Sequence, residues 1–337
     1  TGSTLNNGSI FIYSKSDDGK IDKDQIFPPI VGTVEHDFGF SISVDGNSMV
    51  VGAPSRAGNG VGRAYIYQRK ASKEWVLKKE IVPDSSTWTT DFGSKVVIEN
   101  DLILIGDRYA RSEDGMVYAL YFNKNLGNWI KINPIWTDQI ISHGLFGHDI
   151  DIYQNRAIIG SRDGNIAIEY LFDSSNLNWV SRQVFSPKKF QSKGRFGFSV
   201  KISDSKVFIG YPGYDQKGEV QVFDQGNYQW ELKQTIVNNE LEEGMFFGAS
   251  ISINKDQLMI GNFNGEKVFS YRLNDKNSYE QNQILAPQNL PGSKFGRSIS
   301  MTSKQLLIGA TYGEIAYMYQ KLDGDKWQIA EVLNSEK

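Results

Sequence analysis

Short apolar segments alternate with turns along the whole chain, and no segment of useful length has the 3.6-residue period of a helix. One kind of segment alternates apolar and polar residues, as in FGFSISV at 38–44, which predicts a half-buried strand. A second kind is a continuous apolar run that ends in glycine, such as LILIG at 102–106. A third is rich in aromatic residues (GRAYIYQ, 62–68), and a fourth begins with a large aromatic residue (WVLKKEIV, 75–82). The pattern therefore predicts an all-β chain of short strands.

The four kinds of segment recur in a fixed order. A Phe-Gly pair marks each repeat, and a second glycine follows the phenylalanine at the same separation in all six copies. The marking phenylalanines are Phe38, Phe92, Phe146, Phe196, Phe247 and Phe295, and the second glycines are Gly52, Gly106, Gly160, Gly210, Gly261 and Gly309. A repeated unit of four strands, which we name A to D in chain order, buries its two apolar faces by stacking on its neighbours, as the blades of a propeller do. We expect a seven-bladed β-propeller of four-stranded antiparallel blades.

The register of the repeat also predicts the blade boundaries. We expect one domain over 1–337, with a half blade at 1–33 and six full blades at 34–90, 91–144, 145–194, 195–245, 246–293 and 294–337. Residues 1–33 contain only strands C and D, so the first blade is expected to be incomplete in this chain. The spacing predicts a further Phe-Gly pair upstream of Gly2, at the separation that the six copies share.

Composition excludes several classes of protein. The 337 residues carry 36 Lys and Arg against 39 Asp and Glu, and this formal net charge of −3 argues against general nucleic-acid binding. No apolar stretch approaches the length of roughly 18 residues that a membrane-spanning helix needs. There is no cysteine, which excludes disulfides, zinc–thiolate sites and thiol nucleophiles.

The segment FGFSISVDGNSMVVGAP at 38–54 resembles the FG-GAP repeat of integrin α-subunit propellers, and GRAYIY continues the resemblance. The other five copies keep Phe-Gly and the second glycine but replace Ala-Pro. The resemblance implies an extracellular or cell-surface propeller that binds proteins or glycans, for example in cell adhesion. The calcium loop of the family is not carried over, because the A–B turns are short and poor in acidic residues. We therefore expect neither a metal nor a cofactor.

The loops that vary most between repeats are the candidates for binding, since a scaffold keeps its strands regular and places recognition in its loops. The B–C and D–A loops share one end of each blade and contain Arg, Tyr, Trp and Lys residues, types that include the main binding hot spots. The alternative is an ordinary solvated loop surface. The candidate ligand-binding residues are Arg56, Trp88, Arg108, Tyr109, Arg111, Lys188, Tyr211 and Tyr214.

Charged residues replace the usual serines of strand A in three consecutive repeats. Equivalent positions on adjacent inner strands should lie close together, so we predict a structural ladder in which Asp149 and Asp151 bridge Lys95 on one side and Lys201 on the other. The alternative is a polar site for a ligand or an ion.

No nucleophile elbow, phosphate loop or carboxylate constellation emerges, so we predict no catalytic residue. The leading interpretation is a non-enzymatic module that binds a protein or glycan through the loop end of the blades. One alternative is a building block of a larger surface assembly, with neighbouring subunits as partners. The other is a propeller hydrolase or lyase.

Overall fold

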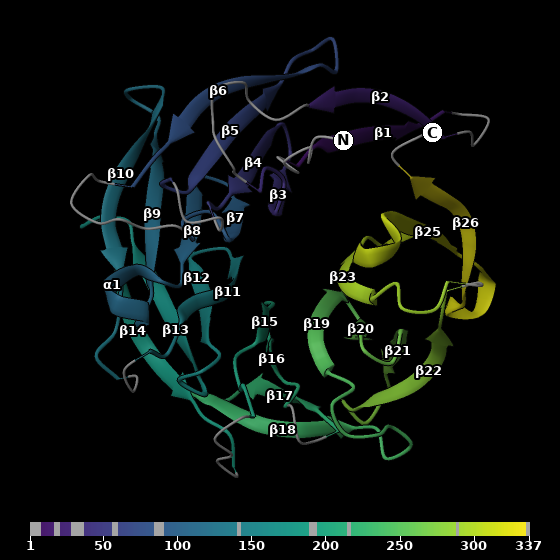
Figure 1. The fold of residues 1–337 in the computed structure, drawn as a ribbon. Coiled ribbons are helices and arrows are strands. Elements are labelled where there is room, and N and C mark those ends of the chain that lie inside the picture. Colours follow the sequence, from purple (N-terminus) through teal and green to yellow (C-terminus); the bar gives the residue numbers. More distant parts are fainter. Residues whose placement is uncertain are drawn as a thin grey trace. The chain divides into compact units, whose positions relative to one another are not determined.

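The computed structural model describes residues 8–16, 21–27, 37–55, 60–83, 91–139, 143–188, 194–213, 217–287 and 290–334. The expected all-β architecture is confirmed: the described residues form 26 strands, with α1 (Ala110–Glu113) and two short 3-10 turns between them. They make six four-stranded antiparallel blades and one two-stranded sheet (Figure 1). The six full blades match the prediction, and the total of seven stays a prediction. The chain divides into two compact units, Thr1–Phe185 and Ser186–Lys337, which are described separately.

The first unit holds the two-stranded sheet and three blades, each with its strands paired in chain order. The two-stranded sheet consists of β1 (Ile10–Lys15) and β2 (Ile21–Phe27). The blades are β3 (Ser41–Asp45), β4 (Ser48–Ala53), β5 (Arg63–Arg69) and β6 (Trp75–Ile81); β7 (Lys95–Glu99), β8 (Leu102–Asp107), β9 (Met116–Asn123) and β10 (Asn128–Ile135); and β11 (Phe146–Tyr153), β12 (Arg156–Ser161), β13 (Ile166–Asp173) and β14 (Asn178–Phe185).

The second unit, green to yellow in Figure 1, holds three further blades of the same topology. They are β15 (Ser199–Ile202), β16 (Lys206–Tyr211), β17 (Glu219–Gln225) and β18 (Trp230–Val237); β19 (Phe247–Asn254), β20 (Gln257–Asn262), β21 (Lys267–Leu273) and β22 (Tyr279–Leu285); and β23 (Phe295–Met301), β24 (Gln305–Ala310), β25 (Ile315–Lys321) and β26 (Trp327–Asn334).

Within each unit, the two kinds of repeat glycine allow neighbouring blades to meet backbone to backbone. The glycine of each Phe-Gly pair has a positive φ between 84° and 91°, a region that favours glycine. A Cβ on Gly106 would lie 2.4 Å from the carbonyl oxygen of Gly147 in the next blade, and one on Gly261 would lie 2.2 Å from that of Gly296. The constant spacing of the two glycines thus reflects a contact in which only a hydrogen atom fits.

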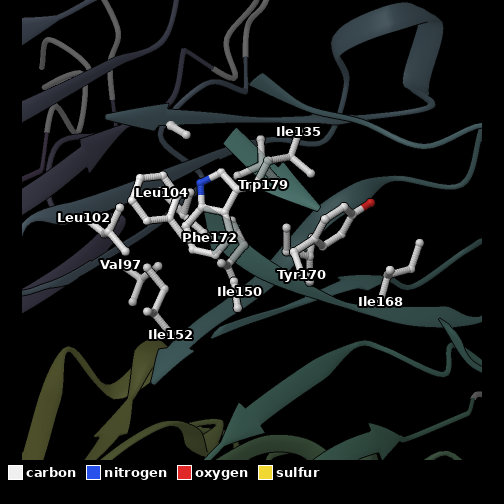
Figure 2. Close-up of a cluster of buried hydrophobic side chains, with 14 of the residues drawn as sticks. Val97, Leu102, Leu104, Ile135, Ile150, Ile152, Ile168, Tyr170, Phe172 and Trp179 are labelled. Carbon is white, nitrogen blue, oxygen red and sulfur yellow. The ribbon is translucent and has the colours of Figure 1, made fainter. Parts of the chain in front are cut away.

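The phenylalanine of each pair fills the space between blades. Phe92 and Phe146 are fully buried, and each packs in one cluster with side chains of the preceding blade. Each also meets an aromatic ring of its own blade edge to face, as Phe92 meets Tyr118 at 4.9 Å between ring centroids. Figure 2 shows the cluster in which Ile150 and Trp179 of blade β11–β14 lie with Leu104 of blade β7–β10. The hydrophobic core therefore runs through the interfaces between blades.

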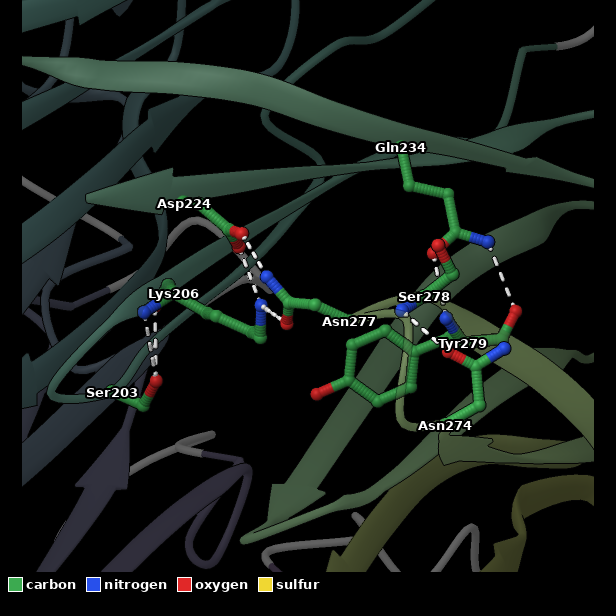
Figure 3. A network of polar contacts seen from close by, with 8 residues as sticks. All are labelled: Ser203, Lys206, Asp224, Gln234, Asn274, Asn277, Ser278 and Tyr279. Carbon is green, nitrogen blue, oxygen red and sulfur yellow. Dashed lines mark hydrogen bonds and ion pairs between the residues drawn. The ribbon is translucent and has the colours of Figure 1, made fainter. Parts of the chain in front are cut away.

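The outer strands of neighbouring blades are joined by a recurring glutamine. In Figure 3, the Gln234 side chain of β18 accepts a hydrogen bond from Tyr279 N at 2.8 Å and donates one to Tyr279 O at 2.9 Å. Gln25 makes the same two bonds with Trp75, and Gln283 makes them with Trp327. Each glutamine is the fifth residue of its strand D, and its partner is the aromatic residue that begins strand D of the next blade. We call this contact the glutamine clasp.

Candidate functional site

The predicted ligand-binding residues fall into three groups. Arg56, Trp88 and Tyr214 lie outside the described residues. Arg108, Tyr109 and Arg111 lie together in the connection between β8 and β9, while Lys188 is exposed after β14. The interpretation of Tyr211 as a loop residue is wrong: it is the last residue of β16, is 3% exposed, and packs its ring edge to face on Phe196. Strand B extends one residue beyond its glycine, and that residue points into the core.

Arg108 is held by a buried carboxylate. Its Nε lies 2.5 Å from Oδ2 of Asp91, a residue with no exposed surface, and its own side chain is 14% exposed. The guanidinium carbon lies 5.3 Å from the centroid of the Tyr109 ring, which is 40% exposed. Such charge-assisted pairs fix the direction of a guanidinium, so Arg108 presents a positioned cation at the loop end of blade β7–β10.

The segment after Arg108 has an unusual backbone. Arg111, Ser112 and Glu113 have φ values of 55°, 59° and 72°, in the left-handed region that L residues seldom occupy in succession. The Arg111 guanidinium carbon lies 4.3 Å from the centroid of the Trp136 ring, which is half exposed. Strained backbone of this kind persists where its surroundings hold it in place.

Hydrogen bonds tie this segment to the next blade. Leu145 N donates to Glu113 O at 3.0 Å, Phe146 N donates to Asp114 O at 2.9 Å, and His143 N donates to Asp114 Oδ1 at 3.0 Å. These contacts join the β8–β9 connection to the residues that enter β11. We call residues 107–115, 143–145 and 161–164 the first-unit loop cluster.

Arg162 and Asp163 complete the cluster, and they were not among the residues predicted from the sequence. Arg162 Nε lies 3.2 Å from Asp163 Oδ1, and the Asp163 side chain is 38% exposed. Asp163 N donates to Gly144 O at 3.2 Å, as does Ser161 Oγ at 2.7 Å. The signal was present, because Arg108 and Arg162 both occupy the second position after the second glycine of their repeats.

The charged residues of strand A form at least one pair between blades. Lys95 Nζ of β7 lies 2.7 Å from Asp149 Oδ1 of β11, with the two side chains 27% and 15% exposed. The positions are equivalent in the two repeats, as the register requires. Asp151 and Lys201 belong to different units, so their contact stays a prediction.

The carboxylate of Glu99, at the end of β7, has a raised pKa. Burial raises the pKa of Glu99 to about 7, with the charges of Asp151 and Asp45 adding to the effect, while a hydrogen bond from Gln154 N opposes it.

Within the described ranges, no group of three His, Cys, Asp or Glu residues could hold a metal ion. In the same ranges, no helix has the length and apolar character needed to cross a membrane.

Sequence and structure comparisons add to this geometry. A family profile of the FG-GAP repeat matches residues 31–67. Among curated proteins, no significant match was found. Among solved structures, the chain is similar to a candidate 6-phosphogluconolactonase of Bacteroides uniformis, with a TM-score of 0.68 and 11% identity over 96% of this chain and 92% of that one. It is also similar to the periplasmic gluconolactonase PpgL of Pseudomonas aeruginosa, with a TM-score of 0.67 and 12% identity over 96% and 91% of the two chains.

These neighbours correct the functional interpretation drawn from the sequence. The non-enzymatic module, whether a binder or a building block, was inferred from the resemblance to the FG-GAP repeat and the absence of a catalytic motif. That inference is wrong, because the same architecture occurs in proteins named for the hydrolysis of sugar lactones. At identities of 11% and 12% the likeness itself shows the fold alone. The FG-GAP repeat at 31–67 and the four-stranded antiparallel blades support a β-propeller of the FG-GAP type.

Proposed function

We propose that this chain is a hydrolase of sugar-derived lactones and that its site is the first-unit loop cluster. The observation that carries the proposal is the Arg162–Asp163 pair, a guanidinium beside a partly exposed carboxylate on a backbone held by hydrogen bonds. The names of the neighbouring structures supply the substrate class.

Lactone hydrolysis requires two groups from the protein. A lactone is a cyclic ester, so its hydrolysis needs a base for the attacking water and a positive group for the carbonyl oxygen as it gains charge. Asp163 takes a proton from water while the hydroxide adds to the carbonyl carbon, and Arg162 stabilises the oxyanion. The ring C–O bond then breaks, and the ring oxygen takes the proton that Asp163 accepted and becomes a hydroxyl group of the product. The product is an open-chain hydroxy acid.

The second arginine extends the site toward the rest of the substrate. Arg108 presents a cation whose direction is fixed by Asp91, and the exposed Tyr109 ring lies beside it. Asp91 is fully buried and acts as a positioning residue. A guanidinium is suited to the hydroxyl, carboxylate or phosphate groups of a sugar acid.

The test is the hydrolysis of glucono-δ-lactone and of 6-phosphogluconolactone, followed by proton release and corrected for the spontaneous reaction. We expect a rate that increases linearly with protein concentration. Asp163→Asn should lower the rate by at least about 100-fold, the usual contribution of a general base. Glu74→Gln removes an exposed carboxylate from the C–D turn at the opposite end of a blade and should leave the rate unchanged. No rate above the spontaneous reaction with either lactone, or full activity in Asp163→Asn, would refute the assignment.

A further inference from the structure

The second unit carries a row of aromatic rings at the loop end of its blades. Phe246, just before β19, lies 5.0 Å from Phe263, just after β20, between ring centroids. On its other side Phe246 meets Phe198 edge to face at 6.5 Å. Tyr312, in the 3-10 turn after β24, is 69% exposed. None of these residues was predicted from the sequence, because the candidates there were drawn from the longest loops.

Two cations lie against these rings. Arg297 Cζ is 5.4 Å from the centroid of the Phe263 ring. Lys294 Nζ is 5.9 Å from the centroids of both Phe263 and Tyr312, and it donates a hydrogen bond to Asn264 Oδ1 at 2.7 Å. Within the part of the chain that the structure describes, no carboxylate lies within ion-pair distance of either cation. The positive charge of this surface is therefore available to an anion.

Hydrogen bonds to Glu266 hold the loop that carries Lys294 in place. The Glu266 carboxylate accepts hydrogen bonds at 2.9 Å from Gly292 N, Ser293 Oγ and Lys294 N. Burial alone would raise the pKa of Glu266, but these bonds outweigh it and hold the pKa below its ordinary value. Tyr312 N donates to Ser293 O at 2.9 Å, which joins the Tyr312 turn to the same loop. A site held in this way loses little conformational entropy when a ligand binds.

We propose that Phe263, Lys294, Arg297 and Tyr312 form a binding site for a pyranose that carries one anionic group. An aromatic face that is solvent-exposed suits the apolar C–H face of a sugar ring, and two neighbouring cations suit a carboxylate or phosphate. A few directed polar groups beside aromatic side chains are typical of small-molecule sites. The site goes beyond the proposed hydrolase activity and does not depend on it, because it lies in the second unit and requires no reaction.

The experiment measures binding with defined probes. The whole chain is titrated with glucuronate, glucose 6-phosphate and methyl β-glucoside, and binding is followed by saturation-transfer NMR and calorimetry. We expect saturable binding of glucuronate, glucose 6-phosphate or both, and binding of the neutral glucoside that is weaker by about tenfold or more. The two anionic probes distinguish a sugar acid from a sugar phosphate.

Variants with matched controls locate the site. Arg297→Gln and Tyr312→Ala should each weaken binding of the anionic probe by about tenfold. Lys276→Gln and Tyr228→Ala remove an exposed lysine and a fully exposed tyrosine from C–D turns, at the opposite end of the blades, and should leave the affinity unchanged. Asp163→Asn should also bind normally, which separates this site from the proposed catalytic one. Absence of saturable binding by both anionic probes, or unchanged affinity in Arg297→Gln and Tyr312→Ala, would overturn the proposal.

Discussion

The Lys95–Asp149 ion pair connects the inner strands of two blades in the first unit, and its contribution to stability is measurable. The perturbation is a double-mutant cycle of Lys95→Met, Asp149→Asn and the combined variant. The atoms lie 2.7 Å apart, and the two side chains are 27% and 15% exposed. The pair is thus neither fully buried nor a surface pair.

The burial of the pair sets the expected magnitude. Removing one partner of a fully buried pair costs about 3–5 kcal/mol, because the remaining charge is left without compensation. Water reaches part of Lys95 and Asp149, so we expect a loss of about 2 kcal/mol for Lys95→Met, below the buried range. The double variant should lose much less than the sum of the single ones, with a coupling energy of about 1–2 kcal/mol.

The assay is urea unfolding of the four proteins at low and high salt. The matched control is the cycle on Lys70 and Glu74, an exposed pair at 3.0 Å whose coupling should stay below about 0.5 kcal/mol and disappear in salt. The Lys95–Asp149 coupling should largely survive the salt. A coupling as small and as salt-sensitive as that of the control would refute the argument that these charges fix neighbouring blades together.

Three further predictions concern other contacts between strands. Because the pKa of Glu99 is raised to about 7, its charged form destabilises the fold above that pH and the penalty is relieved as the pH falls toward 4.5, so Glu99→Gln should raise stability at pH 8 but not at pH 5 in parallel thermal melts. Gly261→Ala should lower the unfolding free energy by about 1–3 kcal/mol, since its Cβ would meet Gly296 O at 2.2 Å, whereas Gly46→Asn, at a turn position with open space, should cost less than about 1 kcal/mol. Gln234→Ala removes both bonds of one glutamine clasp and should cost about 1–2 kcal/mol in urea unfolding, and a wild-type value would show that the clasp does not stabilise the blades.

The blade architecture was predictable because its causes are local and repeated. Phe92 and Gly93 indicate a buried ring and a positive φ, and Gly106, the second glycine of the same repeat, indicates a close backbone contact. Such features survive in the sequence because no other residue type fits them. The Lys95–Asp149 pair followed from the same register, since equivalent positions on adjacent inner strands face one another.

The glutamine clasp and the loop-end chemistry were missed for different reasons. Gln234 and Gln283 recur at the same position of strand D, but that strand is half exposed and rich in polar residues, so a repeated glutamine does not stand out there. Arg162 and Phe263 lie in short B–C loops, whereas the candidates were chosen from long ones. The length of a loop is a poor guide here, because hydrogen bonds from neighbouring segments, such as Asp163 N to Gly144 O, position even a short loop.

One position of the repeat, the second residue after its second glycine, contributes to the proposed sites of both units. That residue directly follows strand B in each blade, so it lies at the loop end. In the first unit that position carries Pro54, Arg108 and Arg162, and the two arginines are each paired with a carboxylate. In the second unit it carries Pro212, Phe263 and Thr311, and of these Phe263 is flanked by Arg297 and Lys294. One structural position therefore supplies guanidinium–carboxylate chemistry in one unit and a cation–aromatic surface in the other. Substitution of Phe263 should mainly change ligand chemistry, whereas substitution of Arg108 should also lower stability, because it removes the ion pair of the fully buried Asp91.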